Sequence, residues 1–320
     1  MRFALASLLL VCHLACLAQV PTGYAKIEDE AVATLHVDGY PDWVEIDGSS
    51  IWISNSALNS LQRIDATTNK IIAEIKVNGP CAALTTGFGA VWVASCKDKA
   101  VLRISQADNR IEATIPMSLA DDEGSIVAGE GAVWVLSDIK GKLSRIDPAS
   151  NTIVALIVVK PYSFAAMTGY GSVWVTNTGP LNGKEIGSVQ RIDPRTNAVI
   201  ITIPVGKQPR FLAVGEGGVW VFNQGDGSMS RIDPASNRVV ATIDCQVPGT
   251  GGDIAAGEGY VWVRAKKRLL LVIDPASNKV IKNFGPPSGS GAVRAGGGSV
   301  WVTAHDVNKI WRLDPKKIKN

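Results

Sequence analysis

The chain has 320 residues, of which 46% are hydrophobic and 19% charged, and its formal net charge is +3. This composition excludes an intrinsically disordered chain and is typical of an ordinary globular protein. The small net charge, with no long basic run, also argues against a nucleic-acid-binding function.

Residues 1–18 are expected to be a secretory signal peptide. They carry one Arg, an apolar stretch of suitable length, and small residues near Ala18, after which we expect cleavage. The alternative is a lipoprotein acylated at Cys16, a pattern that His13 fits poorly. Residues 19–30 are expected to form a short linker. The mature protein is therefore predicted to be extracytoplasmic, either periplasmic or secreted, with no transmembrane segment.

A Trp flanked by β-branched residues recurs seven times along the rest of the chain. Neighbouring copies are 40, 42, 40, 46, 42 and 39 residues apart. Internal similarity at such a period indicates a solenoid, a propeller or an array of repeats. The seven copies are Trp52, Trp92, Trp134, Trp174, Trp220, Trp262 and Trp301.

Each copy is typical of four short strands rather than of helices. In the copy around Trp220, β-branched residues alternate within the runs FLAV, VWVFN, MSRID and NRVVATI. Gly-Glu-Gly between the first two runs supplies the positive φ that a tight hairpin needs. The segment 233–237, Asp-Pro-Ala-Ser-Asn, has the residues of a turn between the last two runs. Each copy is therefore predicted to be a four-stranded antiparallel blade.

The two ends of the repeat region predict a closed ring. The last copy stops after Asp314 without a fourth strand, whereas residues 31–39 resemble a fourth strand that precedes the first Trp. The N-terminal strand would then complete the last blade, which an open solenoid would not need. We predict an all-β fold, a seven-bladed β-propeller over residues 31–315, followed by a basic tail at residues 316–320.

Export would allow the cysteines of the mature chain to form disulfides. If the first hairpin of blade two is symmetric, Cys81 and Cys96 face each other across it, and we predict a disulfide between them. The alternative is two buried thiols. Cys245 has no evident partner.

The same symmetry predicts cross-strand partners in other blades. Because blades seven and one are neighbours in a closed ring, Glu45 and Arg294 are also expected to pair across the seam. Pairs of this kind hold sheets together. The pairs expected within single blades are Asp253 with Arg264, Phe211 with Phe222, Arg294 with Trp301, and Glu45 with Trp52.

Residues that break the repeat are the candidates for ligand binding. In a propeller, the connections between blades and the loops from second to third strand open on one face, where variable residues carry function. Blade four also has an insertion near TGPLNGKEIG that is expected to overhang this face. The candidate ligand-binding residues are Tyr40, Asp42, Trp43, Tyr162, Phe164, Asn177, Arg210, Phe211, Asn223, Gln224 and Lys266.

Two groups of residues on the same face are candidates for chemistry. Glu123 and Asp138 are expected to oppose one another with Asp121 nearby, and an oxygen-rich site of this kind suits Mg²⁺ or Ca²⁺. The alternative is a solvated acidic rim. His305 is a candidate general base, and the alternative is an incidental rim residue.

The pattern VWVTN…VQRIDPRTNAVIITIPVGKQP resembles YVTN-type propeller repeats, and the mature chain is similar to the virginiamycin B lyase-like family of seven-bladed propellers. This resemblance implies a lyase that opens a cyclic depsipeptide of the streptogramin B type by elimination, with a His base and Mg²⁺ held by acidic residues. It leaves His305 as the candidate base. The family's repeats place Glu three residues after the Trp, whereas this chain has Asn55, Ser95, Ser137, Asn177, Asn223, Ala265 and Ala304 there.

The sequence favours an exported propeller that binds a protein, peptide or glycan on its loop face and acts as a monomer. A metal-assisted lyase resembling virginiamycin B lyase is the alternative, so the chain's status as an enzyme stays open. A quinoprotein-like dehydrogenase is disfavoured because no cofactor signature is visible, and no cofactor other than Mg²⁺ or Ca²⁺ is expected.

Overall fold

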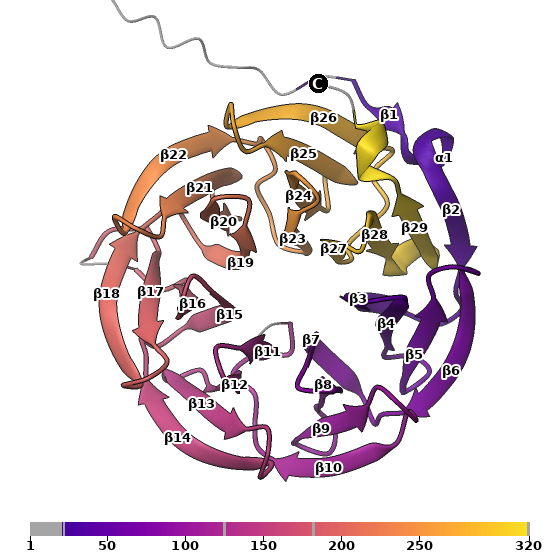
Figure 1. Ribbon diagram of the computed structural model, residues 1–320. Helices are drawn as coiled ribbons and strands as arrows, with labels where there is room; N and C mark the ends of the chain where they lie inside the picture. Colours follow the sequence, from indigo (N-terminus) through magenta and orange to yellow (C-terminus); the bar gives the residue numbers. More distant parts are fainter. Residues whose placement is uncertain (1–20, 22, 124–125, 181–182, 319–320) are drawn as a thin grey trace, which may run out of the picture.

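Seven four-stranded antiparallel units stand around a central channel, each built on one of the seven repeated Trp residues (Figure 1). The computed structural model describes residues 21, 23–123, 126–180 and 183–318. Each repeated Trp lies in the second strand of its blade and is fully buried. The predicted all-β, seven-bladed propeller is therefore confirmed.

The strands of a blade follow chain order from the channel to the rim. Blade one consists of β3 (Pro41–Asp47), β4 (Ser50–Asn55), β5 (Ser60–Asp65) and β6 (Lys70–Lys76), and blade two of β7 (Pro80–Gly87), β8 (Ala90–Ser95), β9 (Ala100–Ser105) and β10 (Ile111–Pro116). Blade three consists of β11 (Ile126–Gly129), β12 (Ala132–Asp138), β13 (Lys142–Asp147) and β14 (Thr152–Val158), and blade four of β15 (Ser163–Gly169), β16 (Ser172–Asn177), β17 (Ser188–Asp193) and β18 (Ala198–Pro204).

Blades five and six follow the same order, and blade seven combines both ends of the chain. Blade five consists of β19 (Pro209–Gly215), β20 (Gly218–Asn223), β21 (Ser228–Asp233) and β22 (Arg238–Asp244), and blade six of β23 (Gly252–Gly257), β24 (Tyr260–Ala265), β25 (Leu270–Asp274) and β26 (Lys279–Gly285). Blade seven consists of β27 (Val293–Gly296), β28 (Ser299–Ala304) and β29 (Lys309–Leu313), completed by the N-terminal β2 (Ala31–His36). Two single 3-10 turns, η1 (His305–Val307) and η2 (Pro315–Lys317), flank β29.

The N-terminal strand closes the ring as predicted. β2 pairs antiparallel with β29, from Ala31 opposite Leu313 to His36 opposite Lys309. The preceding segment is more than the linker that the sequence suggested, because β1 (Ala25–Lys26) pairs in parallel with β26 and a single helical turn, α1 (Ile27–Glu30), follows. The side chain of Ile27 is fully buried among apolar residues of blades six and seven, which explains why this segment is ordered.

A second contact at the seam lies inside the channel. Arg294 of blade seven forms an ion pair with Glu45 of blade one at 3.3 Å and another with Asp253 of blade six at 2.5 Å. The seam pair predicted between Glu45 and Arg294 is therefore confirmed. Asp253 does lie opposite Arg264 in the strand register, but its carboxylate pairs with Arg294 instead.

Charged side chains bridge neighbouring blades at the first hairpins. In the Gly-Glu-Gly turn of blade five, Glu216 and Gly217 have φ of 48° and 71°, the left-handed pair of a tight hairpin turn. The Glu side chain then accepts a hydrogen bond from a backbone N–H of the next blade's turn. In the part of the chain that the structure describes, these contacts join Glu130 to Gly171, Glu216 to Gly259 and Glu258 to Gly298.

A second link between neighbouring blades is made by an Arg that packs on the repeated Trp of its own blade, in every blade except blade six. In blade four, the guanidinium of Arg191 stacks over Trp174 at 4.9 Å. It also donates hydrogen bonds to the carbonyl of Pro234 and to Oδ1 of Asn237, both in the turn of the next blade. The positive φ of Asn237 is what aims this turn at the neighbour. The same link is made by Arg63, Arg103, Arg145, Arg231 and Arg312.

The junction of blades six and seven uses different residues. Val272 occupies the position opposite Trp262 where the other blades have Arg. Tyr260 packs edge-on against Trp262 and donates its hydroxyl to the carbonyl of Ile318. Ile318 itself is buried, so the segment expected to be a free basic tail packs on the ring up to this residue. The junction of blades six and seven thus has its own inter-blade link.

Cys81 and Cys96 form a disulfide with their Cα atoms 5.9 Å apart. Their register differs from the expected one, because the strand pairing shifts between Cys81 and Thr85 and places Cys81 opposite Ala94. Ala82, with φ of 57°, lies at this irregularity. The disulfide therefore crosses the hairpin diagonally. The other expected partners, Phe211 with Phe222, Arg294 with Trp301 and Glu45 with Trp52, are confirmed.

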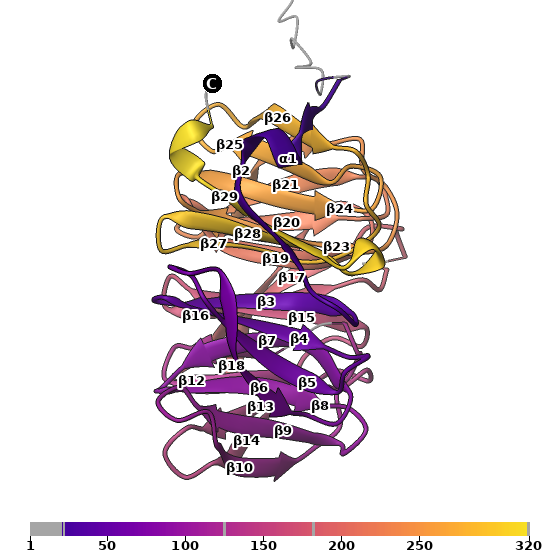
Figure 2. The ribbon, with the colours of Figure 1, turned by 90° about the vertical axis from the view of Figure 1, so that its right-hand side faces the viewer.

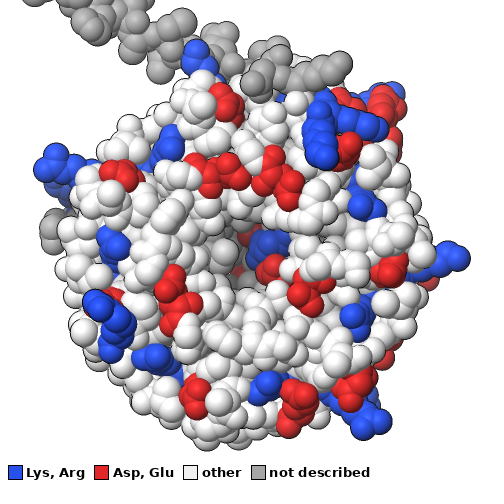
Figure 3. All heavy atoms as spheres, in the orientation of Figure 1, with Lys and Arg blue, Asp and Glu red and all other residues white. Residues whose placement is uncertain are grey.

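The face that carries the first hairpins shows acidic and basic side chains interspersed around a central hollow (Figure 3). It therefore presents no large surface of one charge sign. Within residues 23–123, 126–180 and 183–318, no helix has the length and apolar character needed to cross a membrane.

Replacing Arg191 tests the inter-blade link. Arg191→Met removes the contact with Trp174 and the hydrogen bonds to blade five, so we expect the free energy of unfolding to fall by about 2–4 kcal/mol. Arg195→Met is the matched control, because the Arg195 side chain is exposed on the same blade, and it should cost less than about 0.5 kcal/mol. Urea unfolding of both variants measures the difference. Equal effects would contradict the link.

Candidate functional site

The loops that carry the candidate residues gather on one face of the ring. The connection into each first strand and the loop from second to third strand lie at the same end of a blade, opposite the first hairpins. In the edge-on view of Figure 2, the β27–β28 hairpin turns at the left edge, so the loop face is on the right. The channel opens on this face into a cavity of about 270 Å³, the central pocket, lined by Tyr40, Asp42, Trp43, Glu123, Phe211, Thr250, Gly251, Gly252, Lys266, Ser290, Gly291, His305 and Asp306.

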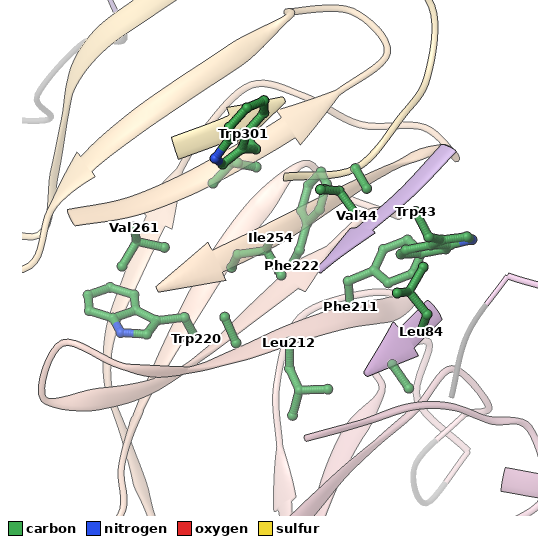
Figure 4. Close-up of a cluster of buried hydrophobic side chains, with 14 of the residues drawn as sticks. Trp43, Val44, Leu84, Phe211, Leu212, Trp220, Phe222, Ile254, Val261 and Trp301 are labelled. Carbon is green, nitrogen blue, oxygen red and sulfur yellow. The ribbon is translucent and has the colours of Figure 1, made fainter. Parts of the chain in front are cut away.

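Aromatic side chains form the floor of the central pocket. Trp43 and Phe211 point toward each other from blades one and five, with ring centroids 5.7 Å apart (Figure 4). Phe164 packs edge-on against Phe211 at 5.3 Å. Trp43 and Phe211 are only 6% and 4% exposed. This layer separates the central pocket from a smaller cavity of about 50 Å³ deeper in the channel.

Arg210 connects this floor to the acidic side of the pocket. Its guanidinium lies 4.7 Å from the centre of the Phe164 ring and 3.5 Å from the Glu123 carboxylate. Partial burial raises the pKa of Glu123, and the charge of Arg210 opposes this rise. Arg210 therefore acts on the pocket through Glu123.

His305 sits in the pocket wall between two hydrogen-bonding partners. Its Nδ1 is 2.8 Å from Oδ1 of Asp306, and its Nε2 is 3.2 Å from the hydroxyl of Tyr40, whose ring stacks on the imidazole at 4.0 Å. Burial lowers the pKa of His305, and Asp306 opposes this change. His305 is therefore expected to be neutral at pH 7, the form in which it can accept a proton.

Tyr40 stays protonated in this setting. Burial and the negative charges of Asp42, Asp306 and Glu123 raise the pKa of its phenol to about 12. It can therefore donate a hydrogen bond but does not act as a base at neutral pH.

Asp42 is a carboxylate in an unfavourable environment. Burial, followed by the charges of Glu123, Asp253 and Asp306, raises its pKa to about 7, although Arg264 opposes this. The nearest ring nitrogen to its carboxylate is Nε2 of the neutral His305, at 4.0 Å. Asp42 is thus destabilised as an anion in the absence of a ligand.

Arg264 holds the wall of the pocket together. Its guanidinium is fully buried and donates hydrogen bonds to the backbone carbonyls of Thr303, Ala265, Leu269 and Ser288. These carbonyls belong to the segments that carry His305, Lys266 and Ser290. Burial lowers the pKa of Arg264 to about 10, although the charges of Asp306 and Asp42 oppose this change.

The structure brings part of the predicted ligand-binding set together. Tyr40, Asp42, Trp43, Phe211 and Lys266 line the central pocket, joined by His305 from the catalytic prediction and Glu123 from the metal prediction.

Other predicted residues lie elsewhere or are not available to a ligand. Tyr162 is exposed outside the central pocket. Asn177, Asn223 and Gln224 are buried, and their amides donate hydrogen bonds to Pro161, to Ser228 and Ser230, and to Gly251. They shape loops because a buried amide must satisfy its donors locally.

Two predictions fall wholly or partly outside the described residues. The signal peptide at residues 1–18, including the acylation site considered at Cys16, lies outside them. The blade-four insertion is described except for residues 181–182, and Glu185 and Ile186 from it line a separate cavity of about 480 Å³.

The carboxylates predicted to hold a metal are engaged by cations. Glu123 lies before β11 and pairs with Arg210, whereas Asp138 pairs with Lys142 at 3.6 Å. Asp121 accepts a hydrogen bond from the backbone of Glu123. Among the described residues, no three His, Cys, Asp or Glu side chains are grouped so as to hold a metal ion. These side chains therefore do not fit a metal site as arranged.

Part of the pocket wall comes from residues that the repeat analysis did not select. Thr250–Gly252 and Ser290–Gly291 belong to the Gly-rich connections into blades six and seven. The available signal was the Gly itself: Gly252, with φ of 108°, lies against the carbonyl of Arg264 and leaves no room for a Cβ.

Asp42→Asn tests the cost of the pocket carboxylate. The folded state raises the pKa of Asp42 from 3.8 to about 7, so it binds this proton more tightly than the unfolded state, and stability is lost as pH rises through this window. Asn cannot ionise, so the variant should be more stable than the wild type by about 1–3 kcal/mol at pH 8, with the gap closing towards pH 4. Urea unfolding at several pH values measures it, with Glu185→Gln as an exposed control. A variant less stable than the wild type at pH 8 would refute this account.

Comparison with known proteins identifies the fold. No protein-family model matches the sequence, and no curated protein matches it. Among solved structures, virginiamycin B lyase from Staphylococcus aureus is similar at 17% identity and a TM-score of 0.73, over 88% of this chain and 98% of that chain. A catalytically inactive His-to-Ala variant of that enzyme, determined with quinupristin, is similar at 16% identity and a TM-score of 0.74, with the same coverage.

A second kind of protein shares the architecture. Hydrazine synthase from Kuenenia stuttgartiensis has a TM-score of 0.73 at 14% identity, over 91% of this chain and 99% of that chain. Identities this low establish the fold and not the activity. The chain is thus a seven-bladed β-propeller with the fold of virginiamycin B lyase.

Proposed function

We propose that this protein is an exported binding module whose central pocket anchors a peptide, or an extended segment of a protein, on the loop face. The observation that carries this proposal is the separation of repeat and non-repeat residues. The repeated Trp, Arg and Asn residues build the ring, whereas the pocket is lined by residues that differ from blade to blade, such as Tyr40, Glu123 and Lys266. Variable residues converging on one concave site are typical of recognition.

Export is supported by the disulfide between Cys81 and Cys96, because disulfides persist in oxidising compartments. The apolar N-terminal sequence supports it independently.

A peptide is favoured over a glycan by the geometry of the aromatic residues. Trp43 and Phe211 are packed in the floor and expose little of their rings. Tyr40 is stacked on His305. No wide aromatic surface is therefore offered to a sugar ring, whereas acidic and basic side chains line the pocket.

Selection from a random peptide library on the purified mature protein tests this function. Thr250 is exposed and lines the pocket, so Thr250→Trp should fill the pocket and abolish binding of the enriched peptides. Thr114→Trp places the same change on the exposed rim strand β10 and should leave binding intact. No enriched peptide, or equal binding by both variants, would remove the central pocket as the binding site.

A metal-assisted lyase is the second candidate. It is favoured by the His305–Asp306 pair, in which a carboxylate orients Nδ1 while Nε2 lies 3.2 Å from the hydroxyl of Tyr40, and all three residues line the pocket. The fold of virginiamycin B lyase adds support. The engaged carboxylates of Glu123 and Asp138 do not support a metal between them.

Thermal melting and a turnover assay separate the two candidates. Because Glu123 and Asp138 are paired with cations, we expect millimolar Mg²⁺ or Ca²⁺ to leave the melting temperature unchanged, and quinupristin to remain intact by mass spectrometry. Asp138→Asn and His305→Ala are the matched variants. If the wild type linearises quinupristin and His305→Ala does not, the lyase replaces the binding proposal. If a metal ion raises the melting temperature of the wild type but not that of Asp138→Asn, a metal site exists.

A further inference from the structure

The carboxylate of Asp42 faces the central pocket without a hydrogen-bond donor. Among the described residues, none donates a hydrogen bond to either oxygen, and only the backbone carbonyl of Asp42 is bonded, to the hydroxyl of Thr303. In the described part of the chain, its one ion-pair candidate is His305 at 4.0 Å, which is neutral at pH 7 and whose ring nitrogens already face Asp306 and Tyr40. The Asp42 side chain is only 28% exposed and lines the pocket. An unpaired carboxylate in this position lowers the stability of the folded protein unless a ligand pairs with it.

In the described part of the chain, no Lys or Arg at the pocket forms an ion pair or a hydrogen bond with the Asp42 carboxylate. Arg264 is buried and directs its donors to four backbone carbonyls. Arg210 pairs with Glu123 and packs on Phe164. Lys266 is exposed and is not among the charges that act on Asp42. The protein's own side chains therefore leave Asp42 as an open acceptor.

The surroundings of Asp42 favour a cation over a neutral donor. The carboxylates of Glu123, Asp253 and Asp306 together act on Asp42 more strongly than the opposing charge of Arg264, so the local potential is negative. Carboxylate oxygens in a negative potential attract ammonium and guanidinium groups.

The size of the pocket limits the occupant to one side chain. Its volume of about 270 Å³ lies below the range of roughly 300–1,000 Å³ that is usual for whole drug-sized ligands. The rest of a bound peptide would therefore lie across the loop face, where the exposed Lys266 can donate to a backbone carbonyl.

We propose that the central pocket receives a basic side chain, lysine or arginine, of the bound peptide, with Asp42 as the acceptor of its charged donor. The proposal rests on the peptide-binding function and names its specificity. It makes Asp42 a residue retained for recognition at the expense of stability, since the same carboxylate destabilises the empty protein.

Matched tripeptides test this assignment. The probes are acetyl-Gly-Lys-Gly-amide and the same peptide with norleucine, which keeps the alkyl chain without the charge, measured by calorimetry or ligand-observed NMR at pH 8. We expect the lysine peptide to bind at least about tenfold more tightly than the norleucine peptide, the effect of one charge-assisted contact. n-Butylammonium should compete with the lysine peptide for the pocket. If this small amine binds as tightly as the lysine peptide, the assignment of a peptide as the ligand would be overturned.

Variants distinguish recognition from structure. Asp42→Asn should remove the preference for lysine while leaving the protein folded, and Glu185→Gln, which removes an exposed carboxylate from the blade-four insertion, should not. Equal affinity for the two tripeptides, or an unchanged preference in Asp42→Asn, would overturn the proposal. Library peptides that bind the pocket but lack basic residues would overturn it too, and would leave the proposed function standing. Failure of all peptides to bind would refute both.

Discussion

The ring depends on one contact repeated around it, the guanidinium that stacks on its own blade's Trp and reaches the turn of the next blade. In blade four, Arg191 covers Trp174 and bonds to Asn237. The sheet of a single blade cannot bury both of its faces, so each blade is stable only against its neighbours. The Arg places charged hydrogen bonds at this boundary, and their direction sets how successive blades are oriented.

The junctions on either side of blade seven are held by other contacts than the repeated Arg alone. Blade six lacks the Arg, and Tyr260 with the buried C-terminal Ile318 takes its place. Within the channel, Arg294 joins Glu45 and Asp253 from three successive blades. Together with the N-terminal strand in blade seven, these contacts convert an array with two ends into a ring with none. A closed ring then offers a rigid rim on which loops can differ freely.

The central pocket, unlike the contacts between blades, contains a group that lowers the stability of the protein. Its walls combine a neutral histidine and a protonated tyrosine, both favoured by burial, with Asp42, whose carboxylate form burial disfavours. As an anion without an ion-pair partner, Asp42 weakens the folded protein. Groups that cost stability persist where they meet a ligand, which is why the pocket rather than the repeated core is the place to look for function.

The sequence by itself determined the architecture. The Trp period, the Gly-x-Gly and Asp-Pro turns and the displaced strand at residues 31–39 act locally, through backbone preference and side-chain alternation, so seven blades and their closure could be predicted without coordinates. Tertiary structure alone decided the site. Asn177 and Tyr162 occupy loop positions like those of the pocket residues but turn away from it, and Glu123 meets Arg210 instead of Asp138. Which loops converge depends on the rotation between blades, and that angle comes from contacts between residues far apart in the chain.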